Sequence, residues 1–422
     1  MKVIQTPLIA KSARRFGHCI AVFLWLFFLP SEGRAREFLS LAGKHIVGYQ
    51  GWFGCPTDSV DPRWAHWFGG NESAPRVMVD LWPDLSEFDR EELCATDLRF
   101  PSGGTVHVFS SQVSKTVHRH FHWMNAYGID GAAISRFLSQ ISNPVLLGRT
   151  DLVLRNVRDA AEAENVGFFV MYDLSGLSTD NDVQEIIRDW KRLVNVQRLT
   201  ASPSYMRDRG RPIVALWGLG IGNRPASPQQ AMTLVNYFKE EAGSTVLGGV
   251  PAFWRTLGLD SRKEPEWKEV FRAFDILSPW TVGRYRDPRE ADTFARDVVA
   301  QDLMQTHMNG QEYLPVIFPG FSWHNLQKGR APLDQIQRLC GEFYSRQANN
   351  IIQLGVKSIF TAMFDELDEG TAIFKVIRQP EQLPIDVGLL APDRDCADKG
   401  SDLYLRAAGK ATNALRRRTY QR

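Results

Sequence analysis

SIFTAMFDELDEG, residues 358–370, indicates how this chain folds and where it could act. An apolar run at 358–364 is followed at once by four acidic residues within five positions: Asp365, Glu366, Asp368 and Glu369. Like charges this close repel one another, and burial removes the water that would stabilise them. An acidic cluster directly after a strand that reads as buried is therefore either a solvated turn or a functional site.

Seven earlier apolar runs have the same form, each bounded by glycine, proline or polar residues. Near-continuous runs of Val, Ile, Leu and Phe are typical of parallel strands that are buried on both faces. Segments with apolar residues three and four positions apart separate the runs, as expected of amphipathic helices. The runs cover 45–50, 131–137, 166–173, 212–218, 245–251, 274–280 and 314–320. The expected helices cover 149–164, 182–196, 227–242, 291–308 and 334–354.

Eight strands that alternate with helices predict a (β/α)8 TIM barrel of the α/β class, with a doubly wound open sheet as the alternative. Residues 51–130 form a long insertion after the first strand, with strand-like pieces at 76–81 and 105–109. In a barrel this insertion is the first βα loop, on the face where active sites are built. Since no change of composition divides the chain, one catalytic domain is expected at 36–380. An extension at 381–422, packed on the barrel or partly disordered, is expected to follow it.

The composition is that of a globular protein, with 44% hydrophobic and 23% charged residues and a formal charge of +2, which argues against nucleic acid as the main partner. Near the N-terminus, basic residues precede the apolar stretch CIAVFLWLFFL (19–29), and the small residues Gly33 and Ala35 follow it. This order predicts a signal peptide at 1–35, cleaved after Ala35, because a membrane span needs ~20 apolar residues. The mature chain is then expected to be periplasmic or extracellular, with no stable membrane insertion. An uncleaved anchor is the alternative.

Four cysteines remain after removal of the signal peptide: Cys55, Cys94, Cys340 and Cys396. An even number in an exported chain permits disulfides. Cys55 and Cys94 flank one Pro- and Trp-rich stretch, so this pair is the first candidate. The chain has no CxxC spacing, which argues against a cysteine zinc site.

In a barrel the eighth strand ends at Phe364, which places the acidic cluster at the mouth. Glu366 and Glu369 are three positions apart, and on a helical turn their Cβ atoms would lie roughly 5–6 Å apart. Retaining glycosidases use two carboxyl groups about 5–5.5 Å apart, and the charge of one raises the pKa of the other, which stays protonated as an acid. These two glutamates are therefore the predicted catalytic residues. Asp365 or Asp368 is instead expected to cap a following helix.

Aromatic and polar residues at the ends of other runs favour a sugar site. Flat apolar rings suit the C–H faces of sugars, and their exposure is costly unless they bind something. Arg136, Tyr172 and Asp173 end the second and third runs and could form hydrogen bonds with sugar hydroxyls. Five tryptophans fall at or just after strand ends, namely Trp52, Trp217, Trp254, Trp280 and Trp323. The predicted partner is therefore an oligosaccharide or a polysaccharide.

Two competing motifs carry less weight. His118 and His122 would share a helix face and could bind zinc, but 117–123 reads as the helix before the second strand, away from the mouth. Surface or packing histidines are therefore expected there. GLGIG (218–222) follows a strand but lacks the GxGxxG spacing of a dinucleotide loop. Neither a metal nor a cofactor is expected.

Four segments resemble the endo-α-mannosidases of glycoside hydrolase family 99 and their family 71 relatives. FDELDEGTAIF (364–374) is similar to the FNEWHEGT-type carboxylate motif of these enzymes. GYQGWF (48–53), FHWMNAYGIDGAAISRF (121–137) and PVIFPGFSWHN (315–325) resemble parts of their first, second and seventh barrel units. Tyr49 and His324, which lie in two of these segments, join the predicted substrate-binding residues.

This resemblance implies a retaining (β/α)8 glycosidase that uses no metal. In the family, the first glutamate of the motif acts as a base on the sugar's own 2-hydroxyl, which attacks the anomeric carbon and forms an epoxide-like intermediate. The second glutamate protonates the leaving oxygen and then activates water. Carried over to this chain, Glu366 would be the base and Glu369 the acid/base.

Asp365, Leu367 and Asp368 stand where the family has Asn, Trp and His, so a relative that acts on glycosides other than mannosides is equally compatible with the motif. Two other classes of function stay open. One is a carbohydrate-binding barrel without catalysis. The other is a hydrolase that binds a divalent cation through the four carboxylates.

Overall fold

The apolar run before the acidic cluster forms a strand inside a ring of parallel strands. The computed structural model describes residue 1, residues 38–70 and residues 76–420. β14 (Ser358–Thr361) pairs in parallel with β1 (Lys44–Tyr49) on one side and with β13 (Val316–Ile317) on the other. The first and last strands of the chain are therefore neighbours, as closure of a barrel requires.

The remaining strands follow β1 in sequence order and are all parallel to their neighbours: β6 (Gly131–Phe137), β7 (Gly167–Asp173), β9 (Arg211–Trp217), β10 (Thr245–Pro251), β11 (Ile276–Trp280) and β12 (Glu312–Tyr313). The ring closes between β12 and β13. Leu314 N–H donates to Leu277 O at 2.8 Å, and Phe360 N–H donates to Pro315 O at 2.9 Å. Glu312–Ile317 is thus one seventh strand, interrupted where Pro315 has no N–H to donate. The predicted eight-stranded barrel is confirmed, and the open sheet is wrong.

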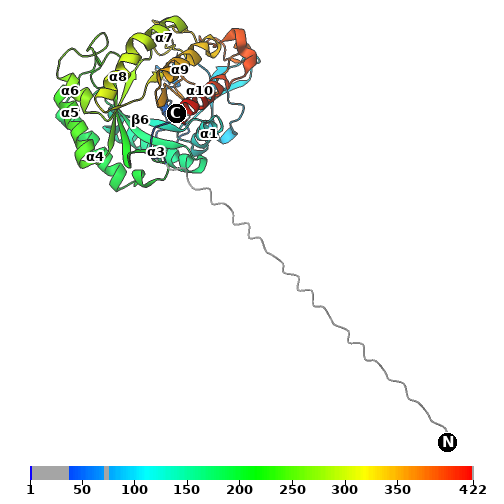
Figure 1. The fold of residues 1–422 in the computed structure, drawn as a ribbon. Helices are drawn as coiled ribbons and strands as arrows, with labels where there is room; N and C mark the ends of the chain where they lie inside the picture. Colours follow the sequence, from blue (N-terminus) through cyan, green and yellow to red (C-terminus); the bar gives the residue numbers. More distant parts are fainter. Residues whose placement is uncertain (2–37, 71–75, 421–422) are drawn as a thin grey trace. The chain divides into compact units, whose positions relative to one another are not determined.

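Ten α-helices lie among the described residues, and Figure 1 shows them around the strands. They are α1 (Ser114–Ala126), α2 (Leu138–Ile141), α3 (Pro144–Glu164), α4 (Asp180–Asn195), α5 (Pro228–Asn236), α6 (Trp267–Ala273), α7 (Pro288–Phe294), α8 (Ala300–Met308), α9 (Glu342–Leu354) and α10 (Leu403–Tyr420). Thr179 caps the start of α4, and Asn165 ends α3 in the left-handed conformation.

Several of the predicted helices differ from the structure in their bounds. The helix predicted at 149–164 begins at Pro144, and the one predicted at 227–242 becomes π-helical after Asn236. The segment predicted as helix from 334 onward becomes α-helical only at Glu342, because Leu339, Cys340 and Gly341 have φ values of 51°, 54° and 84°, outside the helical range. The predicted helix at 291–308 begins earlier, at Pro288, and passes through a π-helical turn between α7 and α8.

α10 lies between α9 and α1 and supplies the eighth helix around the barrel (Figure 1). Tyr127, at the end of α1, donates a hydrogen bond from its hydroxyl to the Asp402 carboxylate at 2.7 Å, and Arg416 of α10 pairs with Asp130 at 2.6 Å. The C-terminal part of the extension predicted at 381–422 is therefore part of the helical layer.

A buried histidine joins α10 to the strands. His45 is fully buried on β1, with Nδ1 2.9 Å from Thr412 Oγ1 and Nε2 2.7 Å from Thr361 Oγ1. Burial lowers the pKa of His45 to about 4 from 6.5, although the charge of Asp130 opposes this. The imidazole is therefore neutral in the folded protein at neutral pH. Its protonation would place a positive charge in a buried site, which is unfavourable.

We expect this histidine to make folding sensitive to acid. Below pH 6.5 the unfolded chain takes up a proton that folded His45 accepts only near pH 4, so stability falls as the pH drops through this range. The contribution is about 3 kcal/mol, from a shift of roughly 2.5 pH units. Urea unfolding between pH 4 and 7 should show a weaker pH dependence for His45→Gln than for the wild type, whereas exposed His122→Gln should change nothing. An equal dependence in His45→Gln would contradict the prediction.

The long first βα loop carries small strands and a disulfide. β4 (Leu93–Arg99) and β5 (Thr105–Phe109) form an antiparallel hairpin, while β2 (Phe68–Gly69) pairs with β3 (Arg76–Val77). The predicted strand at 76–81 is thus limited to its first residues. Cys55 and Cys94 form a disulfide with their Cα atoms 6.4 Å apart, which confirms the pairing proposed from the sequence.

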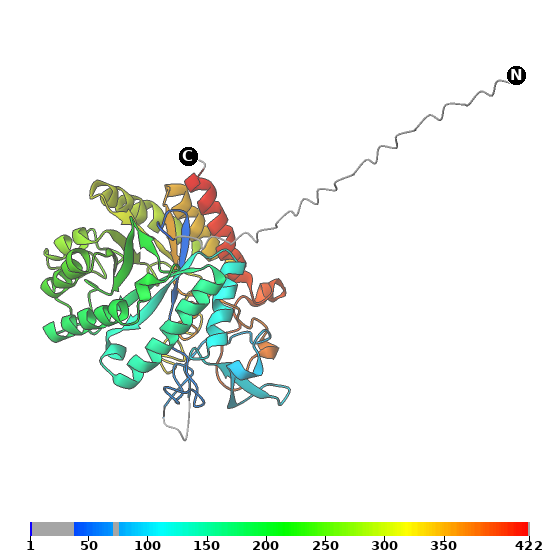
Figure 2. The same ribbon diagram turned by 90° about the horizontal axis from the view of Figure 1, so that it is seen from below.

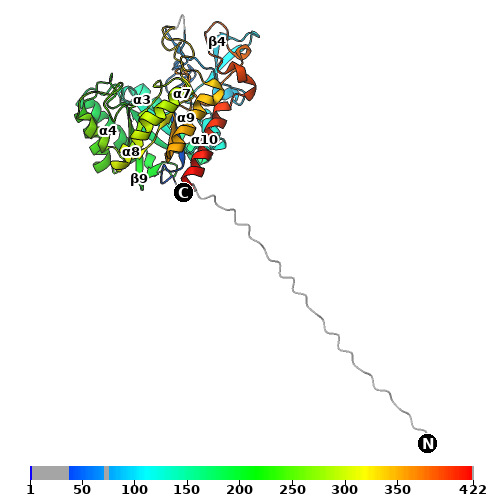
Figure 3. The same ribbon diagram turned by 45° about the horizontal axis from the view of Figure 1, so that its top comes forward.

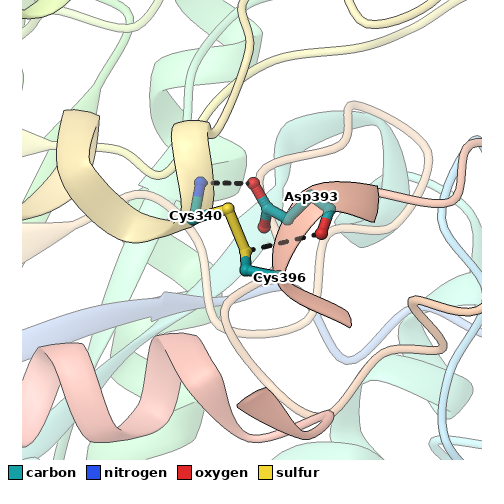
Figure 4. A group of neighbouring side chains, drawn as sticks. All are labelled: Cys340, Asp393 and Cys396. Carbon is teal, nitrogen blue, oxygen red and sulfur yellow. Dashed lines mark hydrogen bonds between the residues drawn. A yellow bond between two sulfur atoms is a disulfide. The ribbon is translucent and has the colours of Figure 1, made fainter. Parts of the chain in front are cut away.

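The segment after β14 packs against this loop at one end of the barrel, as Figures 2 and 3 show in cyan and orange. Ile377 N–H donates to Trp82 O at 2.8 Å, and Leu390 N–H donates to Asp80 O at 2.8 Å. A second disulfide, Cys340–Cys396, joins the segment to the chain just before α9 (Figure 4). Because both sulfur atoms are bonded to each other, Cys340, Cys396 and the neighbouring Asp393 do not form a metal site.

The predicted signal peptide at 1–35 falls almost entirely on residues 2–37, which lie outside the described residues. Export and cleavage after Ala35 stay predictions. In the part of the chain that the structure describes, none of the helices combines the length and the apolar character that crossing a bilayer requires.

Candidate active site

The acidic cluster lies on a turn at the C-terminal mouth of the barrel. Gly370 N–H bonds to Leu367 O at 3.4 Å, and Ser322 N–H donates to Glu369 O at 3.0 Å. Gly370 has φ 62°, and a Cβ there would lie 2.7 Å from Ser322 N, so only glycine fits. Residues 367–370 form a turn outside any helix, and no helix follows this turn directly.

Asp365 ties the first strand to the eighth and does not cap a helix. Its fully buried carboxylate accepts hydrogen bonds from Gln50 N–H and Gly51 N–H, both at 2.8 Å. Burial raises the pKa of Asp365 to about 7, although these two donors oppose the rise. Asp365 therefore holds the loop that follows β1 against the end of β14.

Glu366 is buried and held at both carboxyl oxygens. Gln50 Nε2 donates to Oε1 at 2.6 Å, and Thr371 Oγ1 donates to Oε2 at 2.5 Å. Burial raises the pKa of Glu366 well above its usual value, and the charges of Glu369 and Asp368 raise it further. The two donors oppose this rise because they favour the ionised form. Glu366 is therefore a carboxyl group fixed in position, with a pKa above its usual value.

Glu369 is half-buried on the same turn. Burial raises its pKa to about 7, the charge of Asp368 adds to the rise, and the positive charge of Arg224 opposes it. Because the charge of Glu369 also acts on Glu366, the two carboxyl groups lie within electrostatic range of each other. The structure thus brings the two predicted catalytic residues to one place.

Asp368 is paired with a histidine from the first βα loop. His66 Nδ1 lies 3.0 Å from Asp368 Oδ2, and the His66 ring stacks on Trp52 with centroids 3.9 Å apart and planes 5° apart. Asp368 Oδ1 and Trp52 Nε1 are buried and have no hydrogen-bond partner among the described residues. Trp52 therefore lies beside the acidic cluster, as predicted, but one of its faces is covered by His66.

A second group of site residues comes from β7, β9 and β11. Trp217 and Trp280 are half-buried and meet edge to face with centroids 5.2 Å apart. Arg224 lies over the Trp217 ring at 5.7 Å, and its charge acts on both Glu369 and Asp173. Burial raises the pKa of Asp173, while hydrogen bonds from Ser175 and the charge of Arg224 oppose the rise. These residues form an aromatic and polar border beside Glu369.

Space for Trp217 comes from a glycine on the next strand. A Cβ at Gly249 of β10 would lie 2.3 Å from the Trp217 ring. A larger residue there would displace the indole, so the glycine fixes where the ring lies.

The predictions for Arg136 and Tyr172 are wrong. Arg136 is 1% exposed and donates to Asp189 at 2.6 Å and to Asp151 at 2.9 Å, on α4 and α3. The Tyr172 hydroxyl donates to the same Asp189 at 2.8 Å. Both side chains point into the layer between strands and helices, where they bind helix residues and do not reach the mouth.

Tyr49 and Trp254 are also not substrate-binding residues, for the same reason. Tyr49 is fully buried, and its hydroxyl lies 3.0 Å from His120 Nδ1 on α1. Trp254 is 5% exposed, and its Nε1 donates to Asp302 on α8 at 3.0 Å. His120 is itself a packing histidine, as expected, and burial lowers its pKa to about 3.

Trp323 and His324 lie half-buried on the loop after β13. Their rings bind their own loop: Trp323 Nε1 donates to Gln335 Oε1 at 3.1 Å, and His324 Nδ1 lies 2.7 Å from Ala331 O. Ser322 of this loop contacts Glu369 through its main chain. Their predicted contact with substrate stays a prediction.

The acidic cluster has a poor geometry for a metal ion. Asp365 already accepts two main-chain N–H groups, and both oxygens of Glu366 accept side-chain donors. Among the described residues, no three groups of this cluster bring ligand oxygens within the distance that one cation spans.

Sequence reasoning missed four residues of the site: Gln50, His66, Arg224 and Thr371. Gln50 directly follows the first strand, and a polar residue at that position is a signal that could have identified it. His66 and Arg224 come from irregular loops, where no periodicity shows which way a side chain points.

Comparisons with known proteins bear on the fold alone. Neither a protein-family model nor a curated protein sequence matches this chain. A family 99 endo-α-mannosidase from Bacteroides thetaiotaomicron is 14% identical, with a TM-score of 0.61 over 90% of this chain and 99% of that chain. The same enzyme in complex with bis-tris propane gives a TM-score of 0.63 over 91% and 100%. A structure described as a glycoside hydrolase-like protein gives 0.51 at 14% identity, over 82% and 98%. The chain therefore has the barrel fold of family 99 glycoside hydrolases along most of its length.

Proposed function

We propose that this chain is a retaining glycoside hydrolase that acts on an oligosaccharide or polysaccharide. The observation that carries the proposal is the pair of carboxyl groups, Glu366 and Glu369, held together at the mouth with raised pKa values. General acid–base chemistry at neutral pH needs groups whose pKa lies near the working pH. The half-buried Trp217 and Trp280, linked to Glu369 through Arg224, support a sugar as the ligand.

The hydrogen bonds suggest how the pair divides its roles. Both oxygens of Glu366 already accept donors, which suits the ionised form and a base. Glu369, with a pKa of about 7 and the neighbouring charge of Asp368, suits the proton donor. This division agrees with the roles that the sequence resemblance implies.

In the first step Glu366 takes the proton of the sugar 2-hydroxyl. The sugar oxygen O2 then attacks the anomeric carbon of the same sugar. Glu369 gives its proton to the glycosidic oxygen, and that bond breaks, which leaves a 1,2-anhydro sugar. In the second step Glu369 takes a proton from water, whose oxygen attacks the anomeric carbon. The strained C1–O2 bond opens, and O2 recovers its proton from Glu366. Two inversions give net retention of the anomeric configuration.

The likeness to family 99 supports a glycan as the substrate, but it does not assign the sugar. The printed activity of the Bacteroides thetaiotaomicron relative is endo-α-mannosidase. This chain has Asp368 bound to His66 within its motif, so the charge near the bound sugar differs from that of the FNEWHEGT-type motif. We therefore propose a glycan substrate without assigning mannose to it; a relation to family 71 belongs to this proposal as well.

Export is also part of the proposal. The basic residues, apolar stretch and small residues of the N-terminus support a cleaved signal peptide. The two disulfides support an oxidising compartment, because cytosolic thiols are kept reduced.

The test is hydrolysis of a glycan panel, with NMR detection of the first-formed anomer. We expect cleavage of at least one glycan with retention, and none by the double variant Glu366→Gln/Glu369→Gln. Binding of glycans without cleavage by the wild type would favour a carbohydrate-binding barrel. An inverted anomer would rule out the proposed steps, and loss of activity after chelation would favour a metal-dependent hydrolase.

A further inference from the structure

The turn that carries both glutamates is held from behind by one arginine. Arg338 is 3% exposed, and its Nη2 donates hydrogen bonds to Gly370 O at 2.8 Å and to Ala372 O at 2.6 Å. Its Nη1 is buried and has no hydrogen-bond partner among the described residues, so the two bonds from Nη2 are what offset the cost of burying the group. These bonds hold the main chain on both sides of Thr371.

Thr371 connects the held turn to Glu366. Its hydroxyl donates to Glu366 Oε2 at 2.5 Å, and its N–H donates to Glu366 O at 3.1 Å. Ala372 N–H donates to the same carbonyl at 3.0 Å. A displacement of residues 370–372 would therefore move the donor that holds one oxygen of the Glu366 carboxyl group.

Arg338 is in turn fixed by the C-terminal part of the chain. Its guanidinium lies 4.6 Å from the centre of the Tyr404 ring, and the Tyr404 hydroxyl donates to Asp393 Oδ2 at 2.8 Å. Cys340 N–H donates to Asp393 Oδ1 at 2.6 Å, and Cys340 is bonded to Cys396 (Figure 4). A Cβ at Gly320 would lie 2.6 Å from Arg338 Cγ, so glycine leaves room for the arginine on the other side.

We propose that Arg338 is a positioning residue for the reaction: it holds residues 370–372 so that Thr371 keeps the Glu366 carboxyl group in its working orientation. The proposal rests on the glycosidase function proposed above and extends it to a residue outside the carboxylate motif. It also gives the C-terminal segment a part in catalysis, since Tyr404, Asp393 and the Cys340–Cys396 disulfide hold Arg338 in place.

A merely structural role would give different results. Loss of packing lowers stability, whereas loss of positioning lowers kcat with KM little changed and alters the pH dependence. Burial raises the pKa of Glu366, and the hydrogen bond from Thr371 opposes this rise. If the hydroxyl moves away, the ionised form of Glu366 becomes less favourable, so the limb of the pH profile that reports this base moves to higher pH.

Arg378 is a matched control. It is also 3% exposed and lies in the same network, with Nη2 3.6 Å from Asp393 Oδ2. Its Nη1 donates to Gly400 O at 3.0 Å, and its hydrogen bonds among the described residues do not include the turn at 370–372.

The experiment compares Arg338→Lys, Arg338→Ala and Arg378→Ala on a glycan that the wild type hydrolyses. We expect kcat of Arg338→Ala to fall about 10²-fold. The kcat of Arg338→Lys should fall less, because the lysine ammonium keeps the positive charge and can donate a hydrogen bond to a carbonyl. Arg378→Ala should lose far less of kcat than Arg338→Ala once it is assayed below its unfolding temperature, because Arg378 bonds to Asp393 and Cys396 and makes no hydrogen bond to the turn itself. Equal losses in kcat for the two alanine variants, without a shift of the pH profile, would overturn the proposal.

A cavity beside Arg338 permits a second readout. Arg338, Asp334, Leu383 and Leu390 help to line a cavity of about 720 Å³. Added guanidinium ions can therefore reach the space that Arg338→Ala leaves. Millimolar guanidinium should restore part of the kcat of Arg338→Ala and none of Arg378→Ala, with equal sodium chloride as the salt control. Failure of guanidinium to restore a well-folded Arg338→Ala would count against positioning by the guanidinium group.

The two proposals fail in different ways. If the wild type hydrolyses no glycan, the proposed function fails, and the role of Arg338 is then decided by ¹³C NMR titration of carboxyl-labelled glutamate. The Glu366 signal, assigned with Glu366→Gln, should titrate at higher pH in Arg338→Ala than in the wild type or in Arg378→Ala. An unchanged Glu366 titration would overturn the positioning role whether or not a substrate is found.

Discussion

Glu369→Gln should lower kcat on a hydrolysed glycan by about 10²–10⁴-fold, the usual contribution of a general acid or base. Glutamine has nearly the same size and keeps the turn, but it cannot give a proton to the glycosidic oxygen. Glu366→Gln should have an effect of similar size, because its amide cannot take the proton of the 2-hydroxyl. The exposed Glu381→Gln is the control and should leave kcat unchanged.

The pH dependence provides a second check on Glu369. Because its pKa is raised to about 7, kcat/KM of the wild type should fall as the pH rises above about 7 and the acid loses its proton. Unchanged turnover in both Gln variants would contradict the assignment of Glu366 and Glu369 as catalytic residues and the mechanism that depends on it.

Glu369→Gln should lower activity but raise thermal stability at alkaline pH. A carboxyl group whose folded pKa is raised above its unfolded value of 4.5 stabilises the fold below that value, and this contribution is lost as the pH rises through about 7. Glu369→Gln removes the ionised group, so its melting temperature at pH 8 should exceed that of the wild type. A variant that loses both activity and stability would indicate damage to the turn instead of loss of a proton donor.

Arg136→Met should lower the free energy of unfolding by about 3–5 kcal/mol, the range for breaking a buried ion pair by removal of one partner. The guanidinium is fully buried between Asp189 and Asp151, and without it both carboxylates keep only Arg192 as a cationic partner in this network. Because Arg192 remains, we expect a value near the lower end of this range. Urea unfolding at pH 7 measures it.

Two further variants separate this effect from simple loss of packing. Asp189→Asn combined with Arg136→Met should recover part of the loss, since the uncompensated charge is then removed. Arg296→Met, at an exposed arginine, is the control and should change stability little. A stable Arg136→Met with weakened glycan binding would instead restore the sequence-based interpretation of Arg136 as a substrate residue.

Several features were predictable because they depend on local pattern. Each of the eight apolar runs is a barrel strand, since near-continuous apolar segments fit strands that are buried on both faces. Glu366 and Glu369 follow the eighth strand, and parallel strands place their C-terminal ends together, so the sequence alone located the acidic cluster at the mouth. The Cys55–Cys94 pairing was found in the same way, from two cysteines that flank one loop.

Which way each side chain points was decided by the tertiary structure. Arg136 and Asp173 both lie at strand ends, yet Arg136 binds helix residues while Asp173 is influenced by Arg224 beside Glu369. A strand that is apolar on both faces has no alternation to show which face is turned toward the barrel axis. Contacts between distant parts of the chain, such as His66 with Asp368 and Arg338 with Gly370, join loops that have no periodic pattern. The sequence therefore determined the ring and the place of the carboxylates, and only long-range packing decided which residues surround them.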